Sequence, residues 1–575
     1  MRLPGGAGAK VVSYNLSVTY TVFGAWKRES PFLRAFRIFA VVGLLLLGQG
    51  FAALPARALE AGELRDKLVE AFAVYNGAAG LDSGAGDAYR YSGLQVEPRD
   101  SDFRVTVKGL SLLFDPAKDK RLHLGDVAFT MTPEADADVG DLFRISDLQM
   151  PPVMTVSRGG ESSDLQIKLG SIRLESLWSF AYLTNLNLDA LVLGLEVLDN
   201  RDAASFTVAE LTGEVRSLQQ DGSVYDMTFD FKISDLLARK AGSESRAGQL
   251  DLLLEAEDYD LAQAVEIYRE LGESAAAAAT PEERLRTSLD LMLSPKAWTG
   301  GGGRIQLNAR DVRIKDLADG SAVEFDTFGL GFGLTELDQP LARASLFLDH
   351  SGLRQNGVAV PAGTLEQELL PRETALKITM EKLPFRQIMS EVAATLGKPG
   401  IVTNLVDPSA GGQTGDPAPG GQGSGGQGPS SQEPDPLAMA MSPLVGKLHA
   451  AFTEAGTTIG ISDTRLESRA AALELGGLFA IDPTAALGIS GSLAAGLYGL
   501  DRLIELAQAA MGNPDPEKRK GAMEVIGLLG TLQAYAARSQ ADDGRTVDRY
   551  ELVVEPSGAI TVNGQPLLPA APPPQ

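Results

Sequence analysis

The chain of 575 residues contains no cysteine and only three histidines. Without cysteine it can form no disulfide, no thiolate nucleophile and no cysteine-ligated zinc site. It also lacks the residue to which a bacterial lipoprotein anchor is attached. A chain that enters an oxidising compartment without cysteines avoids mispairing there, so this composition suits an exported protein.

Aromatic residues make up 6 % of the chain, which is low for a carbohydrate-binding surface or for a platform on which bases stack. Positive charge is also scarce, because the net charge is −24. Residues 1–58 carry seven Lys/Arg and one acidic residue, so their removal would leave a net charge of −30. Such a polyanion repels phosphate backbones, and we therefore expect no nucleic-acid partner.

The N-terminal part resembles an export signal. Arg34 and Arg37 precede the apolar segment Ile38–Leu54, and Ala56-Arg57-Ala58 follows as an A-x-A cleavage sequence. This order predicts that residues 1–58 are a signal peptide cleaved after Ala58. The alternative is an uncleaved inner-membrane anchor, for which 17 residues are at the short limit. Both readings place the rest of the chain in the periplasm, and only the uncleaved segment, residues 38–54, would contact a membrane.

Alternating apolar and polar residues dominate the chain from about residue 89 to residue 255. Typical segments are Phe103–Val107, Val127–Met131, Leu165–Leu169 and Met227–Ile233. Turn residues separate them, and helices do not alternate with them, which favours an antiparallel meander. The fold class expected is α+β and β-dominated, with long antiparallel twisted sheets and several amphipathic helices packed on one side.

Several helices are predicted from their capping residues and apolar stripes. The expected helices span residues 59–80, 261–271 with Asp260 as N-cap and Gly272 as stop, a segment after the capping box Thr280–Glu283, a segment from Phe385 to the stop at Gly397, and residues 437–452, 499–511 and 516–538. Residues 457–480 are expected to form long strands, and residues 547–562 a final hairpin.

Composition divides the chain further. Residues 406–436 are rich in Gly, Pro, Ser and Gln and cannot build a core, which predicts a linker. It separates a β-rich domain with inserted helices at 59–405 from a C-terminal α+β segment at 437–566 that completes the β-layer. Residues 567–575 form a tail rich in Pro and Ala, and we expect it to be disordered.

Catalytic and metal-binding patterns are weak. His123, His350 and His449 are scattered over three regions. The stretch Gly488–Ser492 misplaces the glycines of a nucleophile elbow, and Gly300–Gly303 lacks the Lys-Ser/Thr of a phosphate loop and is expected to be a turn. The sequence therefore indicates no catalytic residue, no metal ligand and no cofactor.

Three other patterns have structural explanations. The glycines of Gly329-x-Gly331-x-Gly333 lie on one face of a strand and would permit a close approach of a neighbouring element. Two acidic groups could form a cation site or a catalytic carboxylate pair, and a solvated loop and a helix N-terminus explain them better. These groups are Glu134, Asp136, Asp138 and Asp141, and Glu255, Glu257, Asp258 and Asp260.

A short phrase recurs at irregular spacing. It occurs as Ile145-Ser-Asp-Leu148, Ile233-Ser-Asp-Leu236, Ile314-Lys-Asp-Leu317 and Ile461-Ser-Asp-Thr464. Spacings of 88, 81 and 147 residues exclude a regular solenoid repeat. We interpret the aspartates as turn formers at strand ends, with duplicated β units as the alternative.

The export segment, the strands ending in phrases such as Ile145–Leu148, and the C-terminal stretches Leu473–Asp482, Leu500–Ala510 and Gly558–Pro566 together resemble AsmA-like and YdgA-like exported proteins of Gram-negative bacteria. The resemblance implies a large twisted β-layer with helices on one side and an envelope role in lipid or outer-membrane homeostasis. It supplies no catalytic residues.

Two functions follow as hypotheses. The first is a non-catalytic periplasmic protein whose β-layer binds an envelope protein or an apolar ligand such as a lipid. The second is a secreted hydrolase, which would require one of the histidines or a carboxylate pair in a pocket.

Overall fold

The computed structural model describes residues 60–568 except for 80–88, 116–119, 135–140, 159–160, 202, 278–279, 299, 357–364, 397–435 and 542–543. The predicted export segment, the larger part of the linker and residues 569–575 lie outside the described residues. Among the described residues, no helix is long and apolar enough to cross a bilayer.

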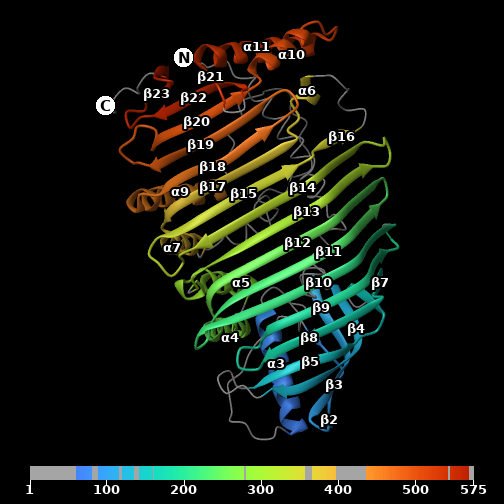
Figure 1. Ribbon diagram of the computed structural model, residues 1–575. Helices are drawn as coiled ribbons and strands as arrows, with labels where there is room; N and C mark the ends of the chain where they lie inside the picture. Colours follow the sequence, from blue (N-terminus) through green and yellow to red (C-terminus); the bar gives the residue numbers. More distant parts are fainter. Residues whose placement is uncertain are drawn as a thin grey trace, which may run out of the picture.

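The expected fold class, α+β and β-dominated, is confirmed: the described strands form one continuous antiparallel sheet (Figure 1). The first twelve are β1 Tyr89–Arg90, β2 Gly93–Arg99, β3 Asp102–Asp115, β4 Lys120–Glu134, β5 Leu142–Gln149, β6 Val153–Arg158, β7 Glu161–Lys168, β8 Ser171–Ser179, β9 Thr184–Asp199, β10 Ala204–Asp221, β11 Val224–Lys240 and β12 Ser243–Asp260. The others are β13 Gly302–Asp316, β14 Ala322–Thr335, β15 Ala342–Ser351, β16 Arg354–Asn356, β17 Glu373–Leu383, β18 Thr458–Glu467, β19 Ala472–Ile481, β20 Ile489–Tyr498, β21 Ala537–Gln540, β22 Thr546–Val554, β23 Ile560–Val562 and β24 Gln565–Leu568.

The connectivity is that of a meander. β5 and β6 follow one another along β4, and β8 and β7 follow one another along β9, so each pair acts as one interrupted strand. From β9 to β15 each strand pairs with the next one in the chain, and β17 pairs with β18 across residues 397–435. Because neighbours in sequence are neighbours in space, the sheet can grow strand by strand.

The helices are inserted into connections between strands. They are α3 Ala61–Ala79, α4 Leu261–Ala277, α5 Pro281–Met292, the 3₁₀ turn Pro295–Ala297, α6 Leu365–Glu368, α7 Phe385–Leu396, α9 Pro436–Ala455, α10 Leu500–Ala510 and α11 Pro516–Tyr535. In Figure 1, α4, α5, α7 and α9 lie behind the sheet along its left margin, with α3 at the lower end and α10 and α11 at the upper end. The described helices therefore cover a margin and the two ends of the sheet.

Local signals placed several helix boundaries correctly. α7 starts after Pro384 and ends before Gly397, as predicted. Thr280 caps α5 by accepting a hydrogen bond from the Glu283 N–H at 3.1 Å. Asp260 accepts hydrogen bonds from the N–H groups of Ala262 and Gln263 at the start of α4. These side chains satisfy main-chain donors that have no partner within the helix.

Three predicted boundaries were wrong. α4 continues past Gly272 to Ala277, because buried Leu271 holds that turn and three alanines favour helix. α11 ends at Tyr535 instead of residue 538, because Arg538 lies on β21 and its guanidinium donates to both carboxylate oxygens of buried Asp548 at 2.9 and 3.2 Å. The predicted tail also begins too early, since Leu567 belongs to β24.

The aspartates of the recurring phrase are mostly not turn formers at strand ends. Asp147, Asp235 and Asp463 lie inside β5, β11 and β18 with φ of 52°, 51° and 48°. The register shifts beside Asp147 and Asp463, as at a β-bulge, whereas β11 keeps its register with both neighbours at Asp235. All three have the left-handed conformation that aspartate tolerates better than most other side chains. Asp316 alone of the four ends a strand, where it accepts a hydrogen bond from the Ala318 N–H.

Left-handed residues align into a line across the sheet, which we call the crease. They are Gly109, Gly125, Gly194, Asp235 and Asp311 on β3, β4, β9, β11 and β13, and Gly352 directly after β15. Pairing confirms the alignment: Gly170 donates its N–H to Leu193 and Gly194, and Gly248 and Asp326 lie opposite Asp235 and Asp311. We call the parts of the sheet on the two sides of the crease its limbs.

The same side of both limbs is apolar. On β11 the apolar side chains are Phe229, Phe231 and Ile233 before the bulge, and Leu236 and Ala238 after it. The alternation therefore changes phase at Asp235, which keeps apolar side chains on one side. Near α3, residues of both limbs share one core cluster, in which Ile233 and Leu250 meet Leu236 and Ala247. We call this apolar side of the sheet the inner face and the opposite side the outer face.

An ion pair holds α3 against the residue that precedes β5. Lys67 Nζ donates to Asp141 Oδ2 at 2.6 Å, with side-chain exposures of 20 % and 15 %, and Lys67 lies 5.7 Å from the centre of the Phe180 ring. This contact explains Asp141, and Glu134 pairs with Arg144 at 2.6 Å. Asp136 and Asp138 lie outside the described residues.

We expect Lys67→Ala to destabilise the N-terminal core by about 1–3 kcal/mol, because a half-buried carboxylate loses its partner. Urea unfolding followed by Trp178 fluorescence measures the loss. Arg65→Ala is the control, since Arg65 and its neighbour Asp66 are exposed and 3.8 Å apart, and it should change stability by less than about 0.5 kcal/mol. Equal effects of both variants would show that the Lys67–Asp141 contact is not structural.

Candidate functional site

The middle of the inner face carries aligned rows of apolar side chains. One row joins directly paired residues on eight strands: Val215, Phe229, Leu254, Ile305, Phe332, Leu346, Ile378 and Ile461. The next row joins Phe231, Leu252, Leu307, Leu330, Leu348 and Leu376. Paired residues on adjacent strands lie about 5 Å apart, so each row is a continuous apolar strip.

Helices cover only the margin of these rows. Leu334, Ala344 and Met380, at the ends of their strands, pack with Phe385 of α7 and with Trp298 in a small core. Toward the crease the cover stops within the described part of the chain. Ile305 and Phe332 are 45 % and 44 % exposed, and Leu330 and Leu346 are also exposed. Adjacent exposed apolar side chains of this size mark binding surfaces.

Aromatic side chains line the crease at β14 and β15. Phe325 lies on one limb of β14 and Phe328 on the other, and their rings meet edge to face with centroids 6.3 Å apart. Phe325 also contacts the His350 ring at 5.7 Å. These aromatic rings pack together at the crease on β14 and β15. The apolar rows of the inner face therefore lie between the crease and the helix-covered margin.

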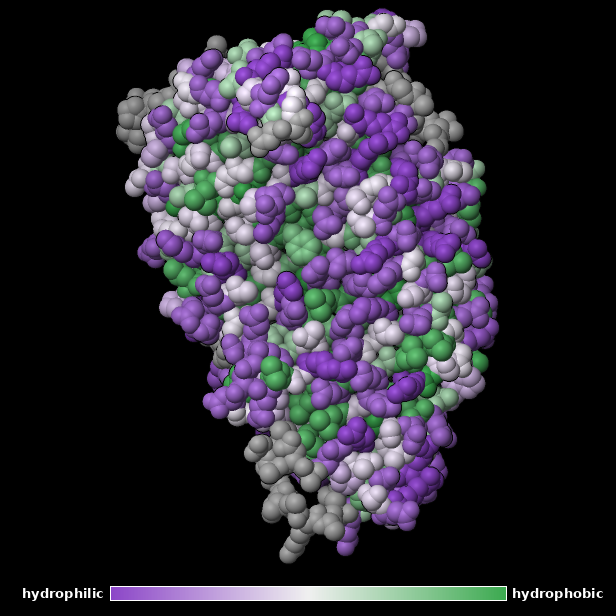
Figure 2. Space-filling model, viewed as in Figure 1, coloured by the Kyte–Doolittle hydropathy of each residue, from purple (hydrophilic) through white to green (hydrophobic). Residues whose placement is uncertain are grey.

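The outer face differs in chemistry. Figure 2 shows hydrophilic residues in rows across the face of the sheet opposite the helices, with small apolar patches between them. Charged residues are among them. Many of these charges are paired: Arg304 with Glu255 at 2.7 Å, and Arg354 with Asp326 at 2.6 Å. Exposed pairs of this kind contribute little to stability, and they keep this face soluble. Glu255 is thereby explained as one member of a surface ion pair.

The glycines of β14 are on the outer face. A side chain at Gly331 would overlap the ring of Phe347, and one at Gly329 would overlap the carboxylate of Asp349, both on β15. The predicted close approach is therefore to the side chains of a neighbouring strand. Phe347 lies over the strand where glycine leaves room, and this also fixes the register that exposes Leu330 and Phe332 on the inner face.

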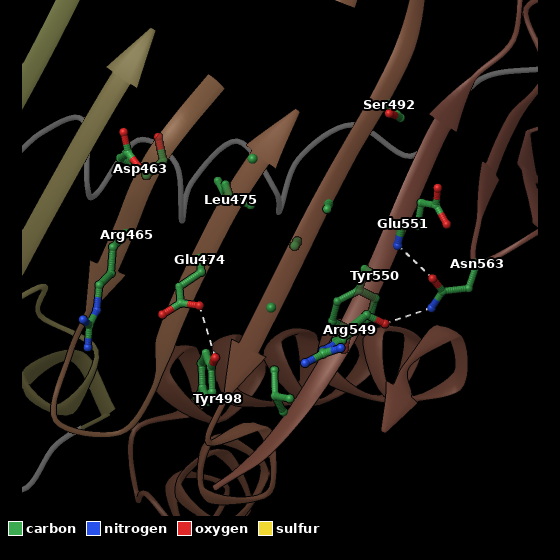
Figure 3. A pocket seen from close by; sticks show the side chains of 16 residues that line it. Asp463, Arg465, Glu474, Leu475, Ser492, Tyr498, Arg549, Tyr550, Glu551 and Asn563 are labelled. Carbon is green, nitrogen blue, oxygen red and sulfur yellow. Dashed lines mark hydrogen bonds between the residues drawn. The ribbon is translucent and has the colours of Figure 1, made fainter. Parts of the chain in front are cut away.

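A hollow of about 820 Å³ lies on the outer face near the C-terminal end (Figure 3). Its floor is made of small residues, among them Gly476, Ala494 and Gly496. The Tyr498 hydroxyl donates to Glu474 Oε2 at 3.1 Å, and Asn563 bonds the main chain of Glu551 and Arg549. Since these polar groups satisfy one another, we assign the hollow no chemistry.

The three histidines lie on separate elements. His123 on β4 is 2.7 Å from Ser157 Oγ, and His449 is on α9 near Gly488. His350 is on β15 at the crease, where burial lowers the pKa of its imidazole, opposed by the charge of Asp349 and a hydrogen bond to the main chain of Arg372. Ser490 and Ser492 lie inside β20, a strand without the helix that a nucleophile elbow needs.

The segment Gly300–Gly303, predicted to be a turn, is only partly one. Gly302 and Gly303 are the first residues of β13 and pair with β12 and β14. Within the described residues, no three His, Cys, Asp or Glu side chains are grouped so that they could hold a metal ion. The apolar inner face itself was not located by sequence reasoning. The alternation predicted half-buried strands. It could not show which side chains of neighbouring strands share a face, because the phase of the alternation changes at the crease.

Comparison with known proteins gives no relative: no family model, no curated protein and no solved structure matches this chain.

Proposed function

We propose that this protein is a non-catalytic periplasmic protein of the cell envelope and that its inner face binds the hydrocarbon chain of a lipid. The observation that carries the proposal is the set of aligned apolar rows from β10 to β18, exposed at Ile305, Leu330, Phe332 and Leu346. The envelope location rests on the export segment at residues 38–58 and on the resemblance to AsmA-like proteins.

An extended hydrocarbon chain suits this surface. The rows run across the strands, and neighbouring strands are about 4.8 Å apart, so a chain crossing four or five strands would lie on about 20 Å of continuous apolar side chains. Each buried methylene group contributes about 0.8 kcal/mol. A hydrocarbon of twelve or more carbons can therefore provide enough free energy for specific binding, after the cost of ordering it.

The test is to express the full chain with its own N-terminus in a Gram-negative host, purify it without detergent exchange, and extract it for lipid analysis by mass spectrometry. Fatty acid or phospholipid in near-stoichiometric amounts would support the proposal. A folded protein that carries no lipid, and that does not bind a fluorescent fatty-acid probe after purification, would overturn it and leave protein–protein interaction as the role of the sheet.

A further inference from the structure

A histidine lies on the inner face at the crease. The two rows through Phe229 and Phe231 are apolar, and polar side chains of the same face lie beyond them on Tyr225, Ser245, Gln355, His350 and Thr374. Among these, His350 and Thr374 are directly paired across β15 and β17. Two polar residues side by side in an apolar surface of this size stand out, because an apolar pair would cost less to bury.

The imidazole of His350 packs against Phe325, with ring centroids 5.7 Å apart. Its Nδ1 is shielded from solvent and has no hydrogen-bond partner. In the neutral tautomer that carries its proton on Nε2, Nδ1 has a lone pair and accepts a hydrogen bond. A buried acceptor without a partner costs about 1–3 kcal/mol, which a bound donor would recover.

We propose that His350 Nδ1 is the anchor for the polar head of the bound lipid, and that this head is the O–H group of a single-chain amphiphile, a protonated carboxylic acid or an alcohol. This inference rests on the proposed function of the inner face. Thr374 lies beside His350 and offers a second hydroxyl to the same head. The hydrocarbon chain would then leave the crease at Leu348 and cross the strands over Leu330 and Leu307.

Three ligands with the same chain length separate the chemistry of the head. Lauric acid and 1-dodecanol each carry an O–H donor, whereas methyl laurate has none. The full chain, labelled with ¹⁵N-histidine, contains three imidazoles, and His350→Phe identifies the signals of His350. Displacement of a fluorescent fatty-acid probe gives the affinities in parallel. His350→Phe suits the aromatic surroundings, and His350→Asn keeps an acceptor near the position of Nδ1.

With lauric acid or dodecanol, we expect the Nδ1 signal of His350 to move toward its hydrogen-bonded value, and those of His123 and His449 to stay unchanged. The donor ligands should bind about fivefold more tightly than the ester, the effect of one hydrogen bond. His350→Phe should remove this difference, and His350→Asn should restore part of it. A response to the acid alone or to the alcohol alone would identify the head.

Two results would overturn the inference in distinguishable ways. If all three ligands bind equally to the wild type and to His350→Phe, and Nδ1 does not respond, the inner face binds hydrocarbon without using His350. If none of the ligands displaces the probe or binds at all, the proposed function of the inner face fails as well.

Discussion

Ile305→Asp should lower the amount of lipid recovered with the protein about tenfold or more. Ile305 lies in the centre of the inner face, is 45 % exposed, and is paired with Phe332. An aspartate there would place an unpaired carboxylate beneath a bound hydrocarbon chain, and its desolvation costs more than the 1.4 kcal/mol that corresponds to a tenfold change. Because the side chain is partly exposed without ligand, the free protein should still fold.

The adjacent residue provides the control. Gln306 is the next residue on β13, and it points to the outer face, where it is paired with Gly331. Gln306→Asp adds the same charge to the same strand on the opposite side of the sheet. Lipid content by mass spectrometry and secondary structure by circular dichroism should match the wild type for this control. Equal loss of lipid in both variants would indicate a general effect of charge, and undiminished lipid in Ile305→Asp would place the ligand elsewhere.

The contrast between these two residues shows what alternation alone can predict. Alternation assigned segments such as Met227–Ile233 to half-buried strands, and the structure agrees. It could not show that β11 continues through Asp235 to Lys240, because the left-handed residue Asp235 reverses the phase of the pattern at that point. A reversal of phase looks like the end of a strand in sequence, and the predicted strands were therefore too short.

The helices depended on local chemistry and were easier to predict. Pro384 and Gly397 mark the ends of α7, and a stripe of apolar residues fixes its buried side. Arg538 was different, because it follows α11 so closely that the sequence places it in the helix. It lies on a strand because it pairs with Asp548 of β22, both in the ladder and through an ion pair. Contacts between residues distant in sequence likewise place His350 beside Phe325 and Thr374, so its role had no local signal.

Gly499→Ala should lower the stability of the C-terminal part of the sheet by about 3 kcal/mol. Gly499 connects β20 to α10 with φ of 82° and ψ of 19°, a left-handed conformation that costs other residues about 1–2 kcal/mol. A methyl group at this position would also overlap the main-chain oxygen of Ala470, and the main chain cannot move aside as a flexible side chain can. Both effects act on the same residue, so we expect them to add.

The consequence should be local before it is global. α10 packs through Leu500, Leu503 and Ala507 against Ala470, so a shift at Gly499 separates the helix from the sheet. Hydrogen exchange should therefore accelerate most for amides of α10, β19 and β20, and the urea midpoint of this region should fall.

Gly530→Ala is the matched control, because Gly530 is exposed within α11 with open space around it. Alanine favours helix there and should stabilise by about 1 kcal/mol. An unchanged exchange rate in Gly499→Ala would mean that the connection relaxes, and that α10 is held by its apolar contacts without the left-handed glycine.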